Sequence, residues 1–153
     1  MAEKKLDLEA LANAAAGASS NFGEGLQYFG AAKSYEANAG LYDLDAKMTL
    51  VDSHYAAKRM AEQGESFVGS QVAGYAKAGV LFEGSPMKVM LKTERNIRMD
   101  IMTTKYNAVR QANALGFQAL KQRLAAGRAR TRGVQAYGKG IMNMVGAYSL
   151  ASS

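Results

Sequence analysis

The chain has 153 residues with a hydrophobic content of 48%, which is enough for one folded domain with its own core. Aromatic residues make up only 8% and alanine supplies much of the apolar content, so thin, elongated helical packing is favoured over a thick globular core. The absence of cysteine excludes disulfides and thiolate metal sites. No uninterrupted apolar run reaches the ~18 residues of a conventional transmembrane helix. Residues 1–6 do not resemble a signal peptide, so we expect cytosolic synthesis and a retained N-terminus.

The charged residues are unevenly distributed along the chain. Residues 1–100 contain 11 Lys/Arg and 13 Asp/Glu, a net charge of −2, whereas residues 101–153 contain eight Lys/Arg and no acidic residue, a net charge of +8. A cationic segment of this kind suits packaged nucleic acid, acidic lipid head groups or an acidic protein surface. A solvated helix face explains the same count equally well, so charge alone selects no partner.

Residues 1–30 predict a flexible N-terminal arm. Leucines and alanines in residues 6–16 permit a short helix, but residues 17–25 are rich in the turn formers Gly, Ser and Asn. We therefore expect a linker that becomes ordered only against a partner. Four large apolar residues of this arm are expected to dock on a neighbouring subunit or on the hairpin itself: Phe22, Leu26, Tyr28 and Phe29.

Helical periodicity is clear from about residue 31. An apolar stripe advances by three and four through Leu41, Leu44, Met48, Val51 and Tyr55. Beyond it, glycines recur every five residues at Gly64, Gly69, Gly74 and Gly79. Five residues rotate by about 140° around a helix, so these glycines do not share a packing face, and each costs about 1 kcal/mol relative to alanine. Two interpretations remain open: small residues that admit a neighbouring backbone, or a segment built to refold.

Residues 79–86 predict a sharp corner between two helices. Pro86, the only proline, cannot continue a helix from its N-terminal side but fits a first helical turn. We expect the first helix to end near Val80, Gly84 to adopt a positive φ and Ser85 to cap the second helix. The candidate corner residues are Gly79, Leu81, Phe82, Gly84, Ser85 and Pro86. Leu81 and Phe82 are also candidate contacts with a partner or a bilayer.

A second helix is predicted from Pro86 to about Arg132, roughly 70 Å at ~1.5 Å per residue. Its stripe comprises Met99, Met102, Tyr106, Val109, Asn113, Phe117, Leu120 and Leu124. The two helices predict an all-α fold, a long antiparallel hairpin over residues 31–132 in which one stripe of each helix is buried. The outer faces, rich in alanine, would then need homo-oligomeric contacts.

Residues 133–153 predict a short, glycine-rich amphipathic helix at the C-terminus. The cations around its start are candidates for anion, DNA or lipid contact: Lys121, Arg123, Arg128, Arg130, Arg132 and Lys139. Its apolar residues are candidates for membrane or subunit contact: Val134, Tyr137, Ile141, Met144, Val145 and Tyr148. This composition is typical of an interfacial helix and of an oligomer contact. The segment is too short and interrupted to span a membrane independently.

Residue types needed for catalysis are scarce. His54 is the only histidine, which excludes a His-rich zinc site, and we interpret it as a helix-surface residue. Three carboxylates lie along the first helix, Asp43, Asp45 and Asp52, but the sequence identifies no partner that would converge with them in a site. Residues 133–140 share the glycine and lysine spacing of a phosphate loop, but Gly140 stands where Ser or Thr is required and no strand precedes it. We therefore expect no enzymatic activity, cofactor or metal.

One combination of short sequences is distinctive. An Ala-rich helix ends in Gly79-Val80, the corner reads Glu83-Gly84-Ser85-Pro86, and the next helix carries Asn96, Asp100, Tyr106-Asn107-Ala108 and Gln118-Ala119. Over roughly residues 30–153 this order resembles the small internal virion proteins of short-tailed bacteriophages. These are core or ejection proteins that lie near the portal inside the head.

The resemblance implies a protein that is packaged in the virion, leaves it ahead of or with the DNA and assembles in the host cell envelope, in the best-known cases as a channel at the outer membrane. The implied partners are further copies of the chain, the portal and other internal virion proteins, the envelope membrane, and packaged DNA through non-specific contact. Two alternatives remain. One is a static portal-associated or tail adaptor protein, and the other is a DNA-compacting protein that uses the cations of residues 121–139.

Overall fold

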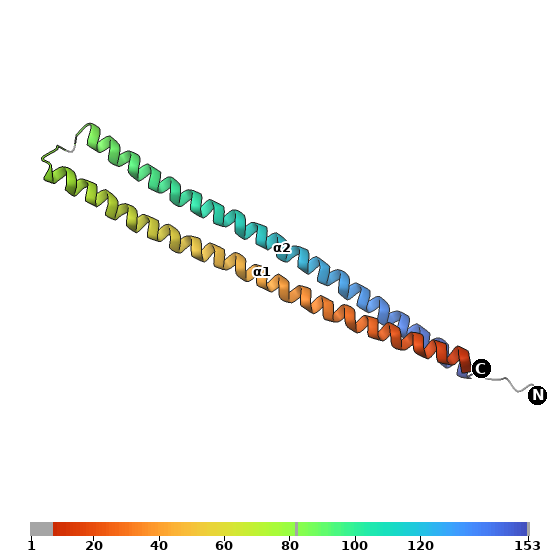
Figure 1. Ribbon diagram of the computed structural model, residues 1–153. Helices are drawn as coiled ribbons and strands as arrows, with labels where there is room; N and C mark the ends of the chain where they lie inside the picture. The colour runs from red at the N-terminus through yellow and green to blue at the C-terminus, as the bar shows by residue number, and fades with distance from the viewer. Residues whose placement is uncertain (1–7, 82, 153) are drawn as a thin grey trace, which may run out of the picture. The chain divides into compact units, whose positions relative to one another are not determined.

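The computed structural model describes residues 8–81 and 83–152. This part of the chain forms two long α-helices and no strand: α1, Leu8–Lys77, with 70 residues, and α2, Ser85–Ser152, with 68 (Figure 1). The predicted all-α class is confirmed. The chain divides into two compact units, in each of which α1 and α2 pack antiparallel. We name them the terminal unit, residues 1–41 with 118–153, and the corner unit, residues 42–117.

A glycine ends α1. Gly79 has a φ of +63°, its N–H donates to the Ala76 carbonyl at 3.2 Å, and the Val80 N–H donates to the Tyr75 carbonyl at 3.1 Å. Together these two bonds form a Schellman motif, which satisfies carbonyls that the last turn would otherwise leave unpaired. The helix therefore ends at Lys77, slightly earlier than predicted, because Gly79 adopts a conformation that other residues rarely adopt.

A second glycine starts α2. Gly84 has the positive φ predicted for it, +73°, and its carbonyl accepts the Lys88 N–H at 3.3 Å. Gly84 thus occupies the cap position predicted for Ser85, which is the first residue of the helix. Pro86 lies in the first turn, where its missing N–H is not needed. Leu81 is 79% exposed between the two helices, and Phe82 lies outside the described residues.

The structure has a helix where the sequence predicts a flexible arm. Helix α1 begins at Leu8 and continues through residues 17–25, and residues 1–7 lie outside the described part. The cause is packing against α2, since Gly25 is buried and both Phe22 and Phe29 contact the Tyr137 ring. These tertiary contacts override the turn-forming composition of the segment.

Residues 133–152 are likewise the end of α2 and do not form a separate short helix. Gly133 and Gly140 are buried, and each lies beneath an aromatic ring of α1. A Cβ on Gly133 would stand 3.2 Å from the Phe29 ring, and one on Gly140 would stand 3.1 Å from the Phe22 ring. The glycines that suggested an interruption of the helix therefore make room for these rings.

The seam between the helices consists of small residues. Among the described residues, the buried hydrophobic ones are all alanine: Ala18, Ala32, Ala39, Ala57, Ala108, Ala112, Ala119, Ala126, Ala129 and Ala136. The buried glycines are Gly25, Gly64, Gly133 and Gly140. Several recur every seven residues, as at positions 18, 25, 32 and 39 of α1, which is the period of a coiled coil. Such small side chains let the two backbones approach closely.

The large apolar stripes face outward, so the prediction that they are buried in the hairpin is wrong. On α1, Leu44, Met48, Val51 and Tyr55 are 52–57% exposed. The α2 stripe is also exposed along its apolar members: Met99, Met102, Tyr106, Val109, Phe117, Leu120 and Leu124. The alanine-rich faces, predicted to lie outside, form the seam because small residues pack two helices more closely than long side chains do.

Candidate subunit interface

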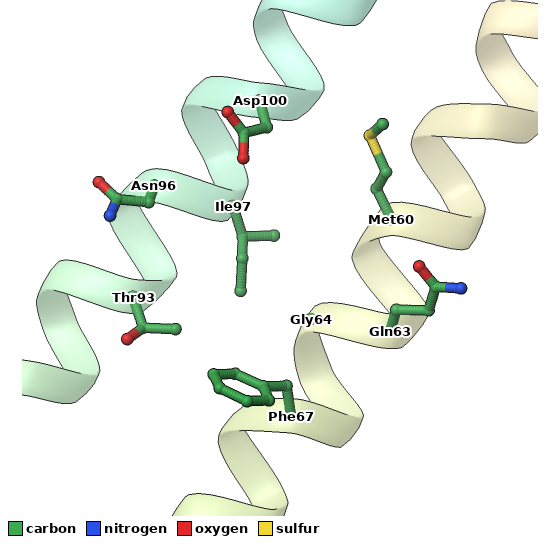
Figure 2. A pocket seen from close by; sticks show the side chains of 8 residues that line it. All are labelled: Met60, Gln63, Gly64, Phe67, Thr93, Asn96, Ile97 and Asp100. Carbon is green, nitrogen blue, oxygen red and sulfur yellow. The ribbon is translucent and has the colours of Figure 1, made fainter.

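One close contact fixes the pairing of the helices in the corner unit. A Cβ on Gly64 would stand 2.8 Å from Ile97 Cγ2, so the Ile97 side chain fills the space that the glycine leaves open. Figure 2 shows Ile97 of α2 directed towards α1 beside Gly64, with Met60 and Phe67 on either side of it. The Thr104 hydroxyl lies 3.7 Å from the Met60 sulfur and donates to it. These contacts set the antiparallel register of this unit.

An open cleft of about 350 Å³ lies beside the Gly64–Ile97 contact. Its lining residues come from both helices: Met60, Gln63, Gly64, Phe67, Thr93, Asn96, Ile97 and Asp100 (Figure 2). Asp100 is the only ionisable residue among them, so the lining holds no pair of titratable groups for acid–base chemistry. In the described ranges, no group of three or more His, Cys, Asp or Glu could hold a metal ion. The cleft has the character of a packing groove.

The exposed stripes of the corner unit lie on opposite outer sides of the helix pair. At 3.6 residues per turn, the stripe from Leu44 to Tyr55 lies about 160° around α1 from seam positions such as Ala57. The stripe from Met99 to Val109 lies about 145° around α2 from seam positions such as Ala108. One apolar stripe therefore faces away from the pair on the α1 side, and the other faces away on the α2 side.

The two stripes have different charged neighbours. Within the corner unit, the α1 part (residues 42–77) has four basic and five acidic residues, whereas the α2 part (residues 85–117) has six basic and two acidic residues. Exposed Asp45 and Asp52 flank one edge of the α1 stripe. Exposed Lys105 and Arg110 flank the α2 stripe, and the Arg110 guanidinium lies 5.9 Å from the centroid of the Tyr106 ring. The α2 side is thus the more cationic of the two.

In the terminal unit, the residues predicted for membrane or subunit contact form two groups, one packed inside the unit and one exposed. Tyr137 belongs to the intramolecular packing, with its ring centroid 5.3 Å from that of Phe22 and 5.7 Å from that of Phe29. The others are 54–77% exposed: Val134, Ile141, Met144, Val145 and Tyr148. The side chains of this group are largely exposed, whereas Tyr137 is held in place by two phenylalanines.

The six cations predicted for anion contact are all exposed. Four of them recur by seven, four and seven residues on one side of α2 and are named the basic row: Lys121, Arg128, Arg132 and Lys139. Arg130 lies on another side and forms an ion pair with Glu36 of α1 at 2.5 Å. The structure therefore assigns Arg130 to contact between the helices and leaves the basic row along one side of α2.

His54 is an exposed residue of α1, in agreement with its interpretation as a helix-surface residue. Its ring centroid lies 6.1 Å from that of Tyr55.

Within the described residues, neither helix contains an apolar stretch that is long enough to cross a membrane.

No protein-family model, curated protein or solved structure is detectably similar to the chain.

The seam does not follow from the large apolar stripes, but it has a sequence signal of its own. On α2, alanine or glycine stands at every seventh residue: Ala112, Ala119, Ala126, Gly133, Gly140 and Ala147. The series Ala18, Gly25, Ala32, Ala39 and Ala46 runs along α1. A heptad repeat of small residues in two helices predicts a close antiparallel pairing, and it leaves the large stripes free for other contacts.

Proposed function

We propose that the protein is a self-assembling structural subunit of a bacteriophage particle. It is an internal virion or ejection protein that lies near the portal and helps to deliver the genome across the host envelope. The observation that carries the proposal is the exposure of long apolar side chains on the outer sides of both helices, around a seam of alanine and glycine. Exposed apolar area of this kind favours association, because its burial contributes about 25 cal/mol per Å².

The order of short sequences around the corner supports a phage particle as the setting of this assembly. The sharpest part of the resemblance to internal virion proteins is the corner, Gly79-Val80 and Gly84-Ser85-Pro86, followed in the next helix by Tyr106-Asn107-Ala108. Gly79 and Gly84 both have the positive φ that the turn requires. The basic row suits non-specific contact with the phosphates of packaged DNA. The exposed apolar residues near the end of α2 suit contact with lipid or with a neighbouring subunit.

Mass spectrometry of purified particles before and after DNA release tests this function. We expect the chain to be present in full particles and absent from emptied ones, because an ejected protein leaves with the genome. Retention in emptied particles would indicate the alternative, a static portal-associated or tail adaptor protein. Absence from full particles would overturn the assignment to the virion.

The membrane step has a separate test on vesicles of phosphatidylethanolamine and phosphatidylglycerol that contain a fluorescent dye. We expect the native protein to release the dye and the variant with Ile141→Lys and Val145→Lys to release about tenfold less, since losing ~1.5 kcal/mol of apolar burial corresponds to roughly that factor. Point substitutions are preferable to removal of residues 133–153, which would also remove Gly133, Tyr137 and Gly140 from the packing.

Gln135→Lys is the matched control, because it adds a cation to the same stretch of α2 at an exposed residue outside the apolar group. It should release dye as the native protein does. Equal release by the double variant would contradict the role of these residues, and absence of release by the native protein would contradict the membrane step.

A further inference from the structure

The two exposed stripes of the corner unit lie on opposite sides of the helix pair, so one neighbour cannot cover both. A two-fold contact would bury one stripe against its own copy and leave the other in water. A heterologous contact, in which α1 of one copy meets α2 of the next, covers both stripes with a single repeated interface. Such a contact closes into a ring or continues as a filament.

The internal register of the corner unit determines which residues would meet. Because Gly64 faces Ile97 and Met60 contacts Thr104, residues 44–55 of α1 lie at the level of residues 106–117 of α2. Copies that point the same way without an axial shift would bring two matching rows together: Leu44, Met48, Val51 and Tyr55 of one copy, and Tyr106, Val109, Asn113 and Phe117 of the next. Both rows advance by three and four, as the ridges of packed helices do.

Charge favours the same pairing over a two-fold α2–α2 contact. An α2–α2 contact would bring Lys105 and Arg110 of one copy towards the same cations of its partner, in a helix segment with six basic and two acidic residues. In an α1–α2 contact with this register, Arg110 lies at the level of Asp52, in a stretch of α1 (residues 42–55) with three acidic residues and one basic residue. Opposite charges around an apolar contact select the partner and fix the register.

We propose that the α1 stripe of the corner unit packs, antiparallel and in register, on the α2 stripe of a second copy of this chain. This interface rests on the self-assembly included in the proposed function. Each copy thereby uses two different surfaces and contacts two neighbours.

Disulfide cross-linking tests the interface directly, because the chain contains no cysteine. Chains with Met48→Cys and chains with Asn113→Cys are purified, oxidised separately and as a mixture, and separated on a non-reducing gel. We expect the mixture to yield at least about fivefold more covalent dimer than either variant alone. A chain that carries both cysteines should form a ladder of larger species.

A mixture of His54→Cys and Asn107→Cys chains is the control, since both residues are exposed and lie off the stripes. Dimer formation no greater than in this control, or equally strong in a single-cysteine preparation, would overturn the interface. Light scattering on the native protein distinguishes a failure of this interface from a failure of self-assembly as a whole. A mass well above 16.3 kDa, together with no more cross-linked dimer than in the control, refutes only this interface. A monomer at every concentration also refutes self-assembly.

Discussion

Gly25 shows at the residue scale why a segment with the composition of a linker is a helix. A Cβ on this buried residue would overlap the Tyr137 ring and stand 3.3 Å from the Gly133 carbonyl oxygen. The Tyr137 ring occupies that space and packs against Phe22 and Phe29. Three rings placed over glycines thus provide the bulk that the alanine seam lacks.

Gly25→Ala should therefore destabilise the protein although alanine is the better helix former. We expect the free energy of unfolding to fall by about 1–2 kcal/mol, because overpacking against a ring and a backbone carbonyl exceeds the ~1 kcal/mol gained in helix propensity. Urea denaturation followed by circular dichroism measures the change. Gly30→Ala is the control, since nothing lies within 4 Å of its added Cβ, and it should gain about 1 kcal/mol. A Gly25→Ala variant as stable as this control would contradict the account.

At the scale of the element, the glycines spaced by five along α1 differ in what they do. Gly64 faces Ile97, Gly69 and Gly74 face open space, and Gly79 adopts a positive φ at the helix end. The interpretation that small residues admit the neighbouring helix therefore applies to Gly64, where α2 is in contact. The five-residue spacing has no common structural cause.

Alanine substitutions should distinguish the structural roles of Gly64 and Gly69. We expect Gly64→Ala to be less stable than Gly69→Ala by about 2 kcal/mol, because the first added methyl meets the Ile97 side chain whereas the second only improves helix propensity. Thermal and urea unfolding of the two variants, measured side by side with the native protein, provide the comparison. Equal stabilities would mean that α2 moves away from α1 at Ile97 without cost.

The elements that the sequence predicts well are those that depend on local chemistry. The corner is specified by Gly79, Gly84 and Pro86, each through its own backbone geometry. The start of α1 and the composition of the seam depend instead on contacts between distant residues, such as Phe22 with Tyr137. A 3.6-residue period identifies an apolar face but does not show whether the same chain or another one covers it. For that reason the period of the stripe from Leu44 to Tyr55 does not reveal that this stripe lies outside the hairpin seam.

For the molecule as a whole, the seam provides little burial for so long a chain. No large side chain among the described residues is less than 2% exposed, and the buried hydrophobic residues there are alanines. Alanine contributes little apolar area when it is buried, so the isolated chain should be marginally stable. Assembly that covers the outer stripes would add the missing burial, and stability would then depend on protein concentration.

Thermal unfolding should therefore shift with concentration. If association accompanies folding, a hundredfold increase in protein adds up to ~2.7 kcal/mol, which corresponds to a rise in Tm of about 5–10 °C for a chain of this size. Circular dichroism melts at micromolar and at hundred-micromolar protein measure this shift. Met48→Lys combined with Val51→Lys should abolish it by placing two cations in the α1 stripe, whereas His54→Lys, on an exposed residue outside the stripe, should preserve it. A Tm independent of concentration in the native protein would show that the alanine seam alone is sufficient to stabilise the helices.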